Sequence, residues 1–179
     1  IKVKEALEAE LKNQNMKDVD VLATGCLGFC EKGPMVVVHP DKYFYQHVKV
    51  EDVPEIVSKT VGKGEVISRL VYRHPETQKT LYREDDLPFY KKQHRIVFGQ
   101  NGMLDPSKIE AYFNINGYQA LAKVLSEMTP EQVISEVKKA GLRGRGGGGF
   151  PAAVKWEGVR RAPGDPKYVI ANGDEGDPG

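Results

Sequence analysis

Two cysteines, Cys26 and Cys30, lie four residues apart and are the only cysteines in the chain. Thiolates are ligands for soft metal centres, and the nearby Gly25, Gly28 and Gly33 let backbone N–H groups turn toward such a centre. A tetrahedral iron or zinc site needs four ligands, so the pair supplies half of one. From the spacing alone, a metal site and a redox-active or incidental thiol pair are equally good interpretations.

The two missing ligands would come from histidine, from another chain or from residues upstream of Ile1. His39 and His47 are the nearest histidines, and both lie in predicted strands at spacings that no common zinc motif uses. A zinc-stabilised nucleotide-binding domain is therefore the weakest of the hypotheses considered.

A glycine-rich loop is the second candidate site. Six of the nine residues from 141 to 149 are glycine, and Phe150 and Pro151 then open a predicted helix that carries Lys155. Exposed backbone N–H groups at a helix N-terminus favour an anionic phosphate. Between residues 138 and 161, seven Lys or Arg residues, among them Arg143 and Arg145, face a single Glu. This local positive charge suits a phosphate rather than a nucleic-acid surface.

Neither standard phosphate-binding motif fits this loop. A P-loop would continue with Gly-Lys-Ser/Thr, and a Rossmann fingerprint would follow a strand, whereas a helix precedes the loop here. The loop therefore indicates a nucleotide or flavin site of another class. The alternative is a flexible linker, but such linkers carry serine and polar residues rather than two arginines and a Phe-Pro helix start.

An amide and three acids, Asn172, Asp174, Glu175 and Asp177, follow a predicted strand over residues 167–171. Polar side chains at a strand end of an α/β sheet face the crevice in which ligands bind, where they can accept hydrogen bonds from sugar hydroxyls. A calcium-like or merely solvated acidic turn is the alternative and would be favoured without the glycine loop.

The elements that would position these residues follow from apolar periodicity. Apolar residues at helical spacing predict helices over residues 2–14, from 51 to about 61, over 106–113, 119–127 and 130–139, and from 150 to about 161. Short strands are predicted over residues 19–23, 35–39 and 43–50, the last two forming a hairpin. Thr129-Pro130-Glu131-Gln132 is a capping box, and Gly141 ends the helix that it opens.

Composition narrows the class of protein. The 179 residues hold one ordinary domain or two small ones, and 40% hydrophobic residues allow a packed core. A net charge of +1 gives no reason to expect a nucleic-acid or membrane partner. No apolar run has the length of a membrane span, and we expect a cytoplasmic protein. The ends predict a piece of a longer protein, because there is no initiator Met and the chain stops directly after the acidic stretch.

The run GLRGRGGGGFPAAVKW, followed by YVIANGDEGDPG, resembles the FMN- and NAD(H)-binding signature of a family of flavoprotein subunits. This family is shared by respiratory complex I, NAD-linked formate dehydrogenases and multimeric NAD(P)-dependent iron hydrogenases. The upstream stretch ATGCLGFCEKGPMVVVHPDKYFYQHVKVEDVPEIV is similar to the C-terminal part of a thioredoxin-like 2Fe-2S ferredoxin domain. That added domain is typical of the hydrogenase beta subunit and of some formate dehydrogenase subunits, whereas the complex I equivalent usually lacks it.

The resemblance implies an α/β fold in three parts. Residues 1–66 would form the C-terminal part of a thioredoxin-like 2Fe-2S ferredoxin domain. Residues 67–100 would form a linker with few apolar contacts, and residues 101–179 the first part of a Rossmann-like FMN/NAD(H)-binding domain.

The resemblance also implies site residues. Cys26 and Cys30 would be the second pair of ligands to a 2Fe-2S cluster, with the first pair before Ile1. The residues that would bind FMN or the nicotinamide dinucleotide are Gly144, Arg145, Gly146, Gly147, Gly148, Phe150, Lys155, Asn172, Asp174, Glu175 and Asp177. Gly148 stands where the family usually has Ala, and Asp177 where relatives often have Glu. No side chain is expected to act as an acid-base catalyst, because the cofactors perform the hydride chemistry.

The function implied is electron transfer between NAD(P)H and iron-sulfur clusters through FMN, in the diaphorase-type subunit of a multi-subunit hydrogenase. The partners would be NAD(P)H, a hydrogenase catalytic subunit and a small 2Fe-2S subunit, and the full-length chain would add a 4Fe-4S cluster. Two alternatives stay open. One is the equivalent subunit of an NAD-dependent formate dehydrogenase, and the other is a ferredoxin-like electron-relay or docking module without its own flavin. The choice between NAD and NADP, and whether electrons are bifurcated, are not decided by these residues.

Overall fold

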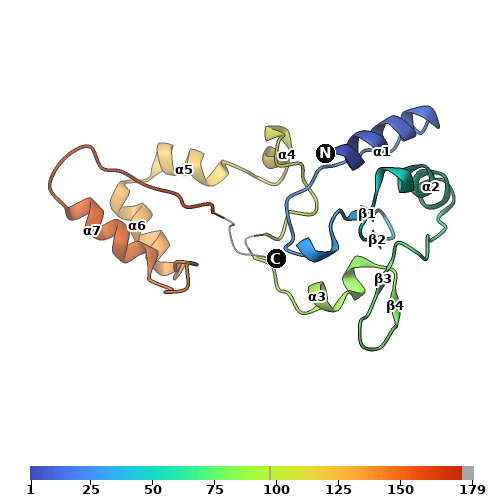
Figure 1. Ribbon diagram of the computed structural model, residues 1–179. Coiled ribbons are helices and arrows are strands. Elements are labelled where there is room, and N and C mark those ends of the chain that lie inside the picture. Colours follow the sequence, from blue (N-terminus) through green and yellow to red (C-terminus); the bar gives the residue numbers. More distant parts are fainter. Residues whose placement is uncertain (97, 175–179) are drawn as a thin grey trace. The chain divides into compact units, whose positions relative to one another are not determined.

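The computed structural model describes residues 1–96 and 98–174 (Figure 1). The described residues form two compact units that divide between Ala111 and Tyr112. None of the helices in these residues combines the length and the apolar character that a membrane crossing needs.

The first unit combines helix α1 (Lys2–Asn13) with two short antiparallel hairpins and a longer helical stretch (Figure 1). The hairpins pair β1 (Val36–Val38) with β2 (Tyr43–Tyr45), and β3 (Tyr72–Arg73) with β4 (Thr80–Leu81). The helical stretch comprises η2 (Val50–Asp52), α2 (Val53–Glu55) and η3 (Ile56–Val61). Further short helical turns are η1 (Cys30–Lys32), η4 (Glu84–Asp86) and α3 (Pro88–Lys91). The first helix, the hairpin and the second helix are thus present as predicted, although the second strand of the hairpin ends at Tyr45 rather than at residue 50.

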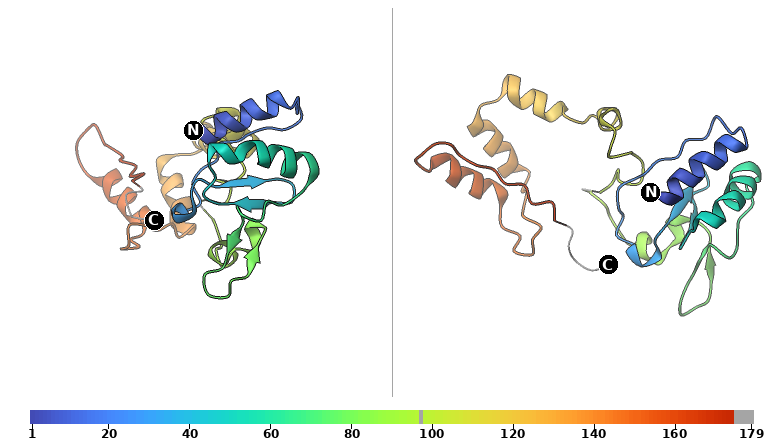
Figure 2. Two further views of the ribbon diagram at one scale, coloured as in Figure 1. Left: turned by 45° about the vertical axis from the view of Figure 1, so that its right-hand side comes forward. Right: turned by 45° about the horizontal axis from the view of Figure 1, so that its top comes forward.

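The two faces of the β1–β2 hairpin pack against different apolar clusters. Because side chains alternate along a strand, Tyr45 belongs to one cluster and its neighbour Phe44 to the other. In the first cluster, the buried Leu7 and Leu11 of α1 pack against the helical stretch of residues 50–61. Helix α1 and this stretch lie side by side (Figure 2). The second cluster consists of Phe29, Phe44, Tyr72, Leu87 and Tyr90. It connects the cysteine-containing loop with α3.

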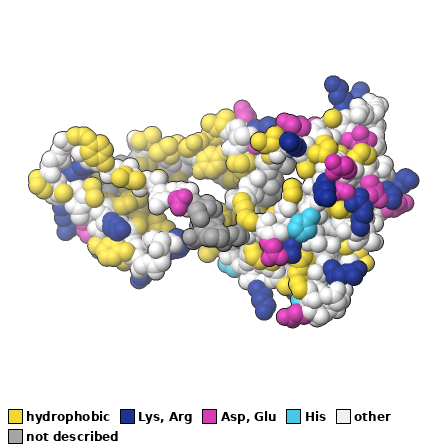
Figure 3. All heavy atoms as spheres, viewed as in Figure 1, with side chains coloured by type: hydrophobic (Ala, Val, Ile, Leu, Met, Phe, Trp, Pro, Cys, Tyr) yellow, Lys and Arg dark blue, Asp and Glu magenta, His cyan; other side chains and the backbone are white. Residues whose placement is uncertain are grey.

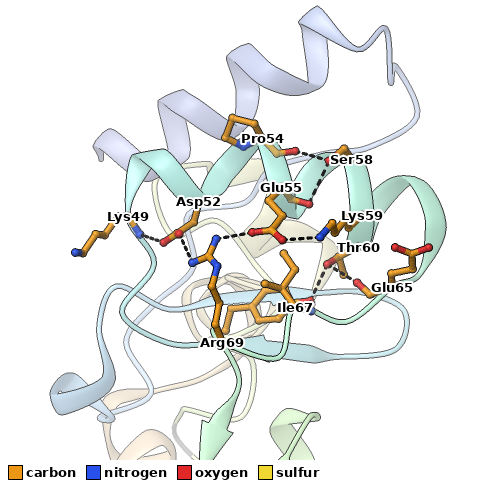
Figure 4. A network of polar contacts seen from close by, with 11 residues as sticks. Lys49, Asp52, Pro54, Glu55, Ser58, Lys59, Thr60, Glu65, Ile67 and Arg69 are labelled. Atoms are coloured by element: carbon orange, nitrogen blue, oxygen red, sulfur yellow. Dashed lines mark hydrogen bonds and ion pairs between the residues drawn. The ribbon is translucent and has the colours of Figure 1, made fainter.

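A polar network joins Arg69, which follows the helical stretch of residues 50–61, to acidic side chains of that stretch (Figure 4). Asp52 accepts a hydrogen bond from the backbone N–H of Lys49 at 2.8 Å and pairs with the Arg69 guanidinium, which also pairs with Glu55. Burial by itself raises the pKa of Asp52, but the bonds from the Lys49 backbone and from Arg69 outweigh it, and the net pKa is lowered. Deeper inside, the Tyr45 hydroxyl lies 2.7 Å from the Thr60 hydroxyl.

Segment 67–100 differs from the expected linker with few apolar contacts. Ile67, Leu70 and Val71 are buried in the first cluster, and Leu87 and Tyr90 in the second. The sequence gives little sign of this burial, because these apolar residues form short groups separated by a long, mostly charged and polar stretch. The domain boundaries themselves stay a prediction.

The strand predicted over residues 19–23 is wrong, because these residues form an irregular loop. A strand requires a neighbouring strand to pair its backbone N–H and C=O groups. Within the described part of the chain, the β1–β2 hairpin pairs only with itself and, through single bridges, with Val71 and Arg83.

Helices make up the regular structure of the second unit as far as residue 174, where its described part ends. They are α5 (Gln119–Glu127), α6 (Pro130–Lys139) and α7 (Ala152–Arg161), while α4 (Ile109–Asn114) contains the point where the units divide. The predicted capping box is present, since Thr129 accepts a hydrogen bond from the Gln132 N–H and the Gln132 side chain accepts one from the Thr129 N–H. Helices α6 and α7 pack together, with a 2.8 Å ion pair between Arg160 and Glu131.

The strand predicted over residues 167–171 is absent from the structure, where these residues are irregular. Tyr168, Val169 and Ile170 are 77%, 88% and 90% exposed. Their aromatic and β-branched types favour a strand, but the described residues of the second unit offer no strand to pair with.

Candidate functional site

The cysteine loop presents both thiols to solvent. Cys26 and Cys30 are exposed and not joined in a disulfide. The backbone turns at Gly28, where φ is +86°, and the Gly28 N–H donates to the Cys26 Sγ at 3.2 Å. Such N–H···S bonds stabilise a thiolate and tune iron-sulfur centres. Two soft, accessible donors with a backbone N–H aimed at one of them therefore fit half of a 2Fe-2S ligand set.

Histidine does not complete this set in the described residues. No group of three or more His, Cys, Asp or Glu side chains is placed there to hold a metal. His47 instead has its Nδ1 3.3 Å from the Gly33 carbonyl oxygen. The arrangement gives no support to the zinc hypothesis.

The cysteine loop is anchored by Phe29, between the two cysteines. Its ring is buried and stacks on Phe89, with centroids 4.3 Å apart and ring planes 5° from parallel. It also lies edge-on to Tyr90, at 5.7 Å. Burying a Phe side chain contributes roughly 2 to 3 kcal/mol. Sequence reasoning assigned no role to Phe29, although a large apolar residue in a glycine-rich loop is itself a signal of anchoring.

Tyr90 forms an apolar wall beside the cysteine loop. Burial, reinforced by the Glu84 carboxylate, raises the pKa of Tyr90 to about 12, and charge on Cys26 and Cys30 acts in the same direction. Its hydroxyl lies 3.9 Å from the Met35 sulfur. Tyr90 therefore stays a neutral phenol at physiological pH and adds no charge next to the thiols.

The glycine loop is a closed turn between α6 and α7. The Gly144 N–H donates to the Phe150 carbonyl and the Ala152 N–H to the Leu142 carbonyl, both at 2.9 Å. The Arg143 guanidinium crosses the turn and donates to the Gly149 carbonyl at 3.0 Å. These bonds set the path of the loop at its base.

The outer face of the glycine loop is open. A Cβ atom added at Gly146, Gly147 or Gly148 would meet nothing within 4 Å. Gly147 also has a φ of +95°, which side-chain-bearing residues rarely adopt. The backbone N–H groups here are accessible to a ligand, as a phosphate-binding loop requires.

The cations around the loop bind protein groups in this structure. Arg145 donates to the Arg143 carbonyl at 2.8 Å, and the Lys155 ammonium lies 5.5 Å from the centroid of the Phe150 ring. The structure thus brings Arg145, Phe150 and Lys155 to the glycine loop. All of these side chains are exposed, so each is free to reach a ligand.

The acidic stretch is described only in part. Asn172 accepts a hydrogen bond from the Asp174 N–H at 2.8 Å, which is a local turn. Glu175 and Asp177 lie outside the described residues.

Apolar side chains are exposed over the second unit (Figure 3), among them Trp156 at 43% and Leu125 at 78%.

Comparison with known proteins connects the glycine loop to a family. Residues 137–179 match the family model described as the Nuo51 FMN-binding domain. This part of the chain is similar to that FMN-binding domain. The match includes the glycine loop, α7 and the acidic stretch, and so every residue predicted to bind FMN or the dinucleotide.

Two curated relatives have similar sequences. The NADP-reducing hydrogenase subunit HndC of Solidesulfovibrio fructosivorans is 50% identical over 88 residues, which are 49% of this chain and 18% of the relative. A subunit of the NADH-quinone oxidoreductase of Rhizobium meliloti is 48% identical over 75 residues, 42% of this chain and 18% of the relative. The chain thus spans about a fifth of the length of these relatives.

A solved structure, a thioredoxin-like [2Fe-2S] ferredoxin from Aquifex aeolicus, is 39% identical in sequence. The match covers 38% of this chain and 64% of the ferredoxin, with a TM-score of 0.37. The described residues combine helices with short antiparallel hairpins, so the predicted α/β class is confirmed, and residues 137–179 match the predicted FMN-binding domain. The resemblance stated from the sequence is likewise confirmed.

Proposed function

We propose that this chain is part of the diaphorase-type flavoprotein subunit of an NAD(P)-linked, multi-subunit hydrogenase. Bound FMN would supply hydride chemistry with NAD(P)H and one-electron chemistry with iron-sulfur clusters. The protein's own residues would bind and orient these groups. The observation that carries the proposal is the open glycine loop at the start of α7, within the Nuo51 family match.

The glycine loop is proposed to bind phosphate. Its accessible N–H groups and the N-terminal end of α7 offer donors and partial positive charge, and Arg145 and Lys155 lie at its rim. Phe150 is half exposed and would stack on a planar ring. The proposed FMN and dinucleotide ligands are Gly144, Arg145, Gly146, Gly147, Gly148, Phe150, Lys155, Asn172, Asp174, Glu175 and Asp177.

Cys26 and Cys30 are proposed as two of the four ligands of a 2Fe-2S cluster. The exposed thiols and the Gly28 N–H directed at the Cys26 sulfur support this role. In the full-length protein we expect a further 4Fe-4S cluster. The partners would be a hydrogenase catalytic subunit and a small 2Fe-2S subunit, and the free thiols are consistent with the reducing cytoplasm.

A second candidate is the corresponding subunit of an NADH-quinone oxidoreductase, because relatives of that description match almost as well as HndC. An NAD-dependent formate dehydrogenase subunit, or a relay module without flavin, are the remaining alternatives. The candidates differ in the electron donor that they accept and in whether they contain flavin.

The test is a cofactor analysis of the native protein. FMN, iron and acid-labile sulfide are quantified per chain, and dye reduction is measured with NADH, NADPH, hydrogen or formate as the donor. We expect one FMN per chain and dye reduction by NAD(P)H and by hydrogen. Iron without FMN would favour the relay module, and reduction by formate but not hydrogen would replace the hydrogenase assignment. A protein with neither FMN nor iron would overturn the proposal.

A further inference from the structure

We propose that Asn101 is a positioning residue for the cysteine loop and sets the direction of the Cys26 thiol. The proposal rests on the proposed cluster-binding role of Cys26. Asn101 lies 75 residues further along the chain, and the motif containing the cysteines gives no indication of its involvement.

Asn101 makes two hydrogen bonds to adjacent residues of the loop. Its side-chain Nδ2 donates to the Cys26 carbonyl at 3.0 Å, and its backbone carbonyl accepts the Gly25 N–H at 2.9 Å. One residue thus holds the backbone on both sides of the Gly25–Cys26 peptide bond. A peptide unit held at its preceding N–H and its following C=O has little freedom to rotate, so the Cα–Cβ direction of Cys26 is fixed.

Close packing accompanies these bonds. A Cβ atom on Gly25 would lie 3.0 Å from the Asn101 Cγ, a tight contact that would push the Asn101 side chain back by a few tenths of an ångström. A Cβ on Gly102 would lie 3.5 Å from the Leu27 Cδ1, which shows that the same segment also approaches the next loop residue. Close van der Waals packing therefore accompanies the hydrogen bonds between the Asn101 segment and the cysteine loop.

The consequence for a metal centre is orientation of a ligand. Groups that orient a ligand from outside the metal's own coordination shell change metal affinity by about 10- to 100-fold when removed. The Gly28 N–H holds the Cys26 sulfur from one side, and Asn101 holds the backbone that carries it. We expect the two to act together on the thiol.

The experiment compares Asn101→Ala with Asn114→Ala, an exposed asparagine of α4, in the native protein. Three quantities are measured: the rate of iron loss to a chelator, the EPR g-values of the reduced cluster, and amide hydrogen exchange at Gly25. For Asn101→Ala we expect about tenfold faster iron loss and shifted g-values. Exchange at Gly25 should also be faster, because the loss of the side-chain bond to Cys26 loosens the segment whose backbone carbonyl accepts the Gly25 N–H. Asn114→Ala should match the wild type in all three. If Asn101→Ala matched it too, the proposal would be overturned.

A double-mutant cycle separates positioning from general damage. Gly25→Ala should speed iron loss in the wild type, because its Cβ meets the Asn101 side chain. In the Asn101→Ala background, Gly25→Ala should speed iron loss by less, because the Asn101 side-chain atoms nearest to the new Cβ have been removed. Additive effects of the two substitutions would contradict a direct contact.

Failure of the proposed function is recognised separately. If the native protein holds no iron, the cluster role of Cys26 fails, and the positioning role fails with it. Amide exchange at Gly25 in the same samples still decides whether Asn101 holds the loop. Iron present with unaltered g-values and unaltered exchange in Asn101→Ala would leave the proposed function standing and remove only this inference.

Discussion

The cysteine loop and the glycine loop are held in opposite ways. The cysteine loop is fixed from outside, by the burial of Phe29 in an aromatic cluster and by Asn101 from a distant segment. The glycine loop is fixed from within, by hydrogen bonds among residues 142–152, and its outer face touches nothing. A thiolate ligand must be oriented toward its metal, whereas a phosphate site needs accessible backbone N–H groups. The contacts that hold each loop therefore agree with the chemistry proposed for it.

The same contrast extends to the two units. The first unit contains two buried apolar clusters. In the described part of the second unit, Ala153 is the buried apolar residue, while Leu121, Leu125 and Trp156 are exposed. Substitutions in the first unit should therefore alter stability, and those in the second should alter binding with little change in stability.

Phe29→Ala should give the largest effect. Truncating a buried ring in a stacked cluster costs about 3 to 4 kcal/mol, so the urea midpoint of the first unit should fall sharply. Phe150→Ala, at a site 49% exposed, is the control and should change stability by less than about 0.5 kcal/mol. Hydrogen exchange of the first unit measures the change, and equal effects would end the contrast between the loops.

Gly147→Val should weaken FMN binding by about 30-fold. Valine is strained at the positive φ of Gly147, at a cost of about 2 kcal/mol, and its methyl groups cover the N–H groups of the loop. Gly164→Val is a matched control, because Gly164 also has a positive φ and open surroundings but lies outside the loop. Quenching of flavin fluorescence on titration gives the affinity, and equal losses in both variants would argue against a phosphate role.

Acid should destabilise the first unit through Asp52. Its lowered folded pKa means that its contribution is complete above the unfolded value of about 3.9 and is lost as the pH falls through the folded value. Asp52→Asn should cost about 1.5 kcal/mol at pH 7 and flatten this loss. Glu51→Gln, on the same 3-10 helix, should leave the acid profile unchanged. In the second unit, the pKa of Glu131 is lowered by Arg160, but that exposed pair should lose its effect in high salt.

Arg143→Ala should loosen the glycine loop by a smaller amount. The loss of its bond to the Gly149 carbonyl, worth about 1 kcal/mol, should speed thermolysin cleavage in the loop by about fivefold. Arg145→Ala is the control, since Arg145 bonds only to carbonyls next to it in sequence. Equal cleavage rates for both variants would show that the loop does not depend on a cross-turn bond.

Local patterns in the sequence were enough to place most helices, the capping box at Thr129 and the hairpin over residues 36–45. They also identified both candidate loops, because cysteine spacing and consecutive glycines are visible without a fold. The strands over 19–23 and 167–171 were wrong for one reason. A strand exists only where another strand pairs with it, and no local pattern reveals a partner.

The sequence by itself determined which chemical groups each loop carries. One loop has two thiols, and the other has glycines and cations in front of a helix. Only the tertiary structure decided how each loop is supported. It buried Phe29 against Phe89, brought Asn101 to the backbone of Cys26, and directed Arg143 across the turn to Gly149. The physical reason is that helix propensity, capping and turn conformation depend on neighbours in sequence, whereas side-chain burial and long-range hydrogen bonds depend on which segments the fold brings together.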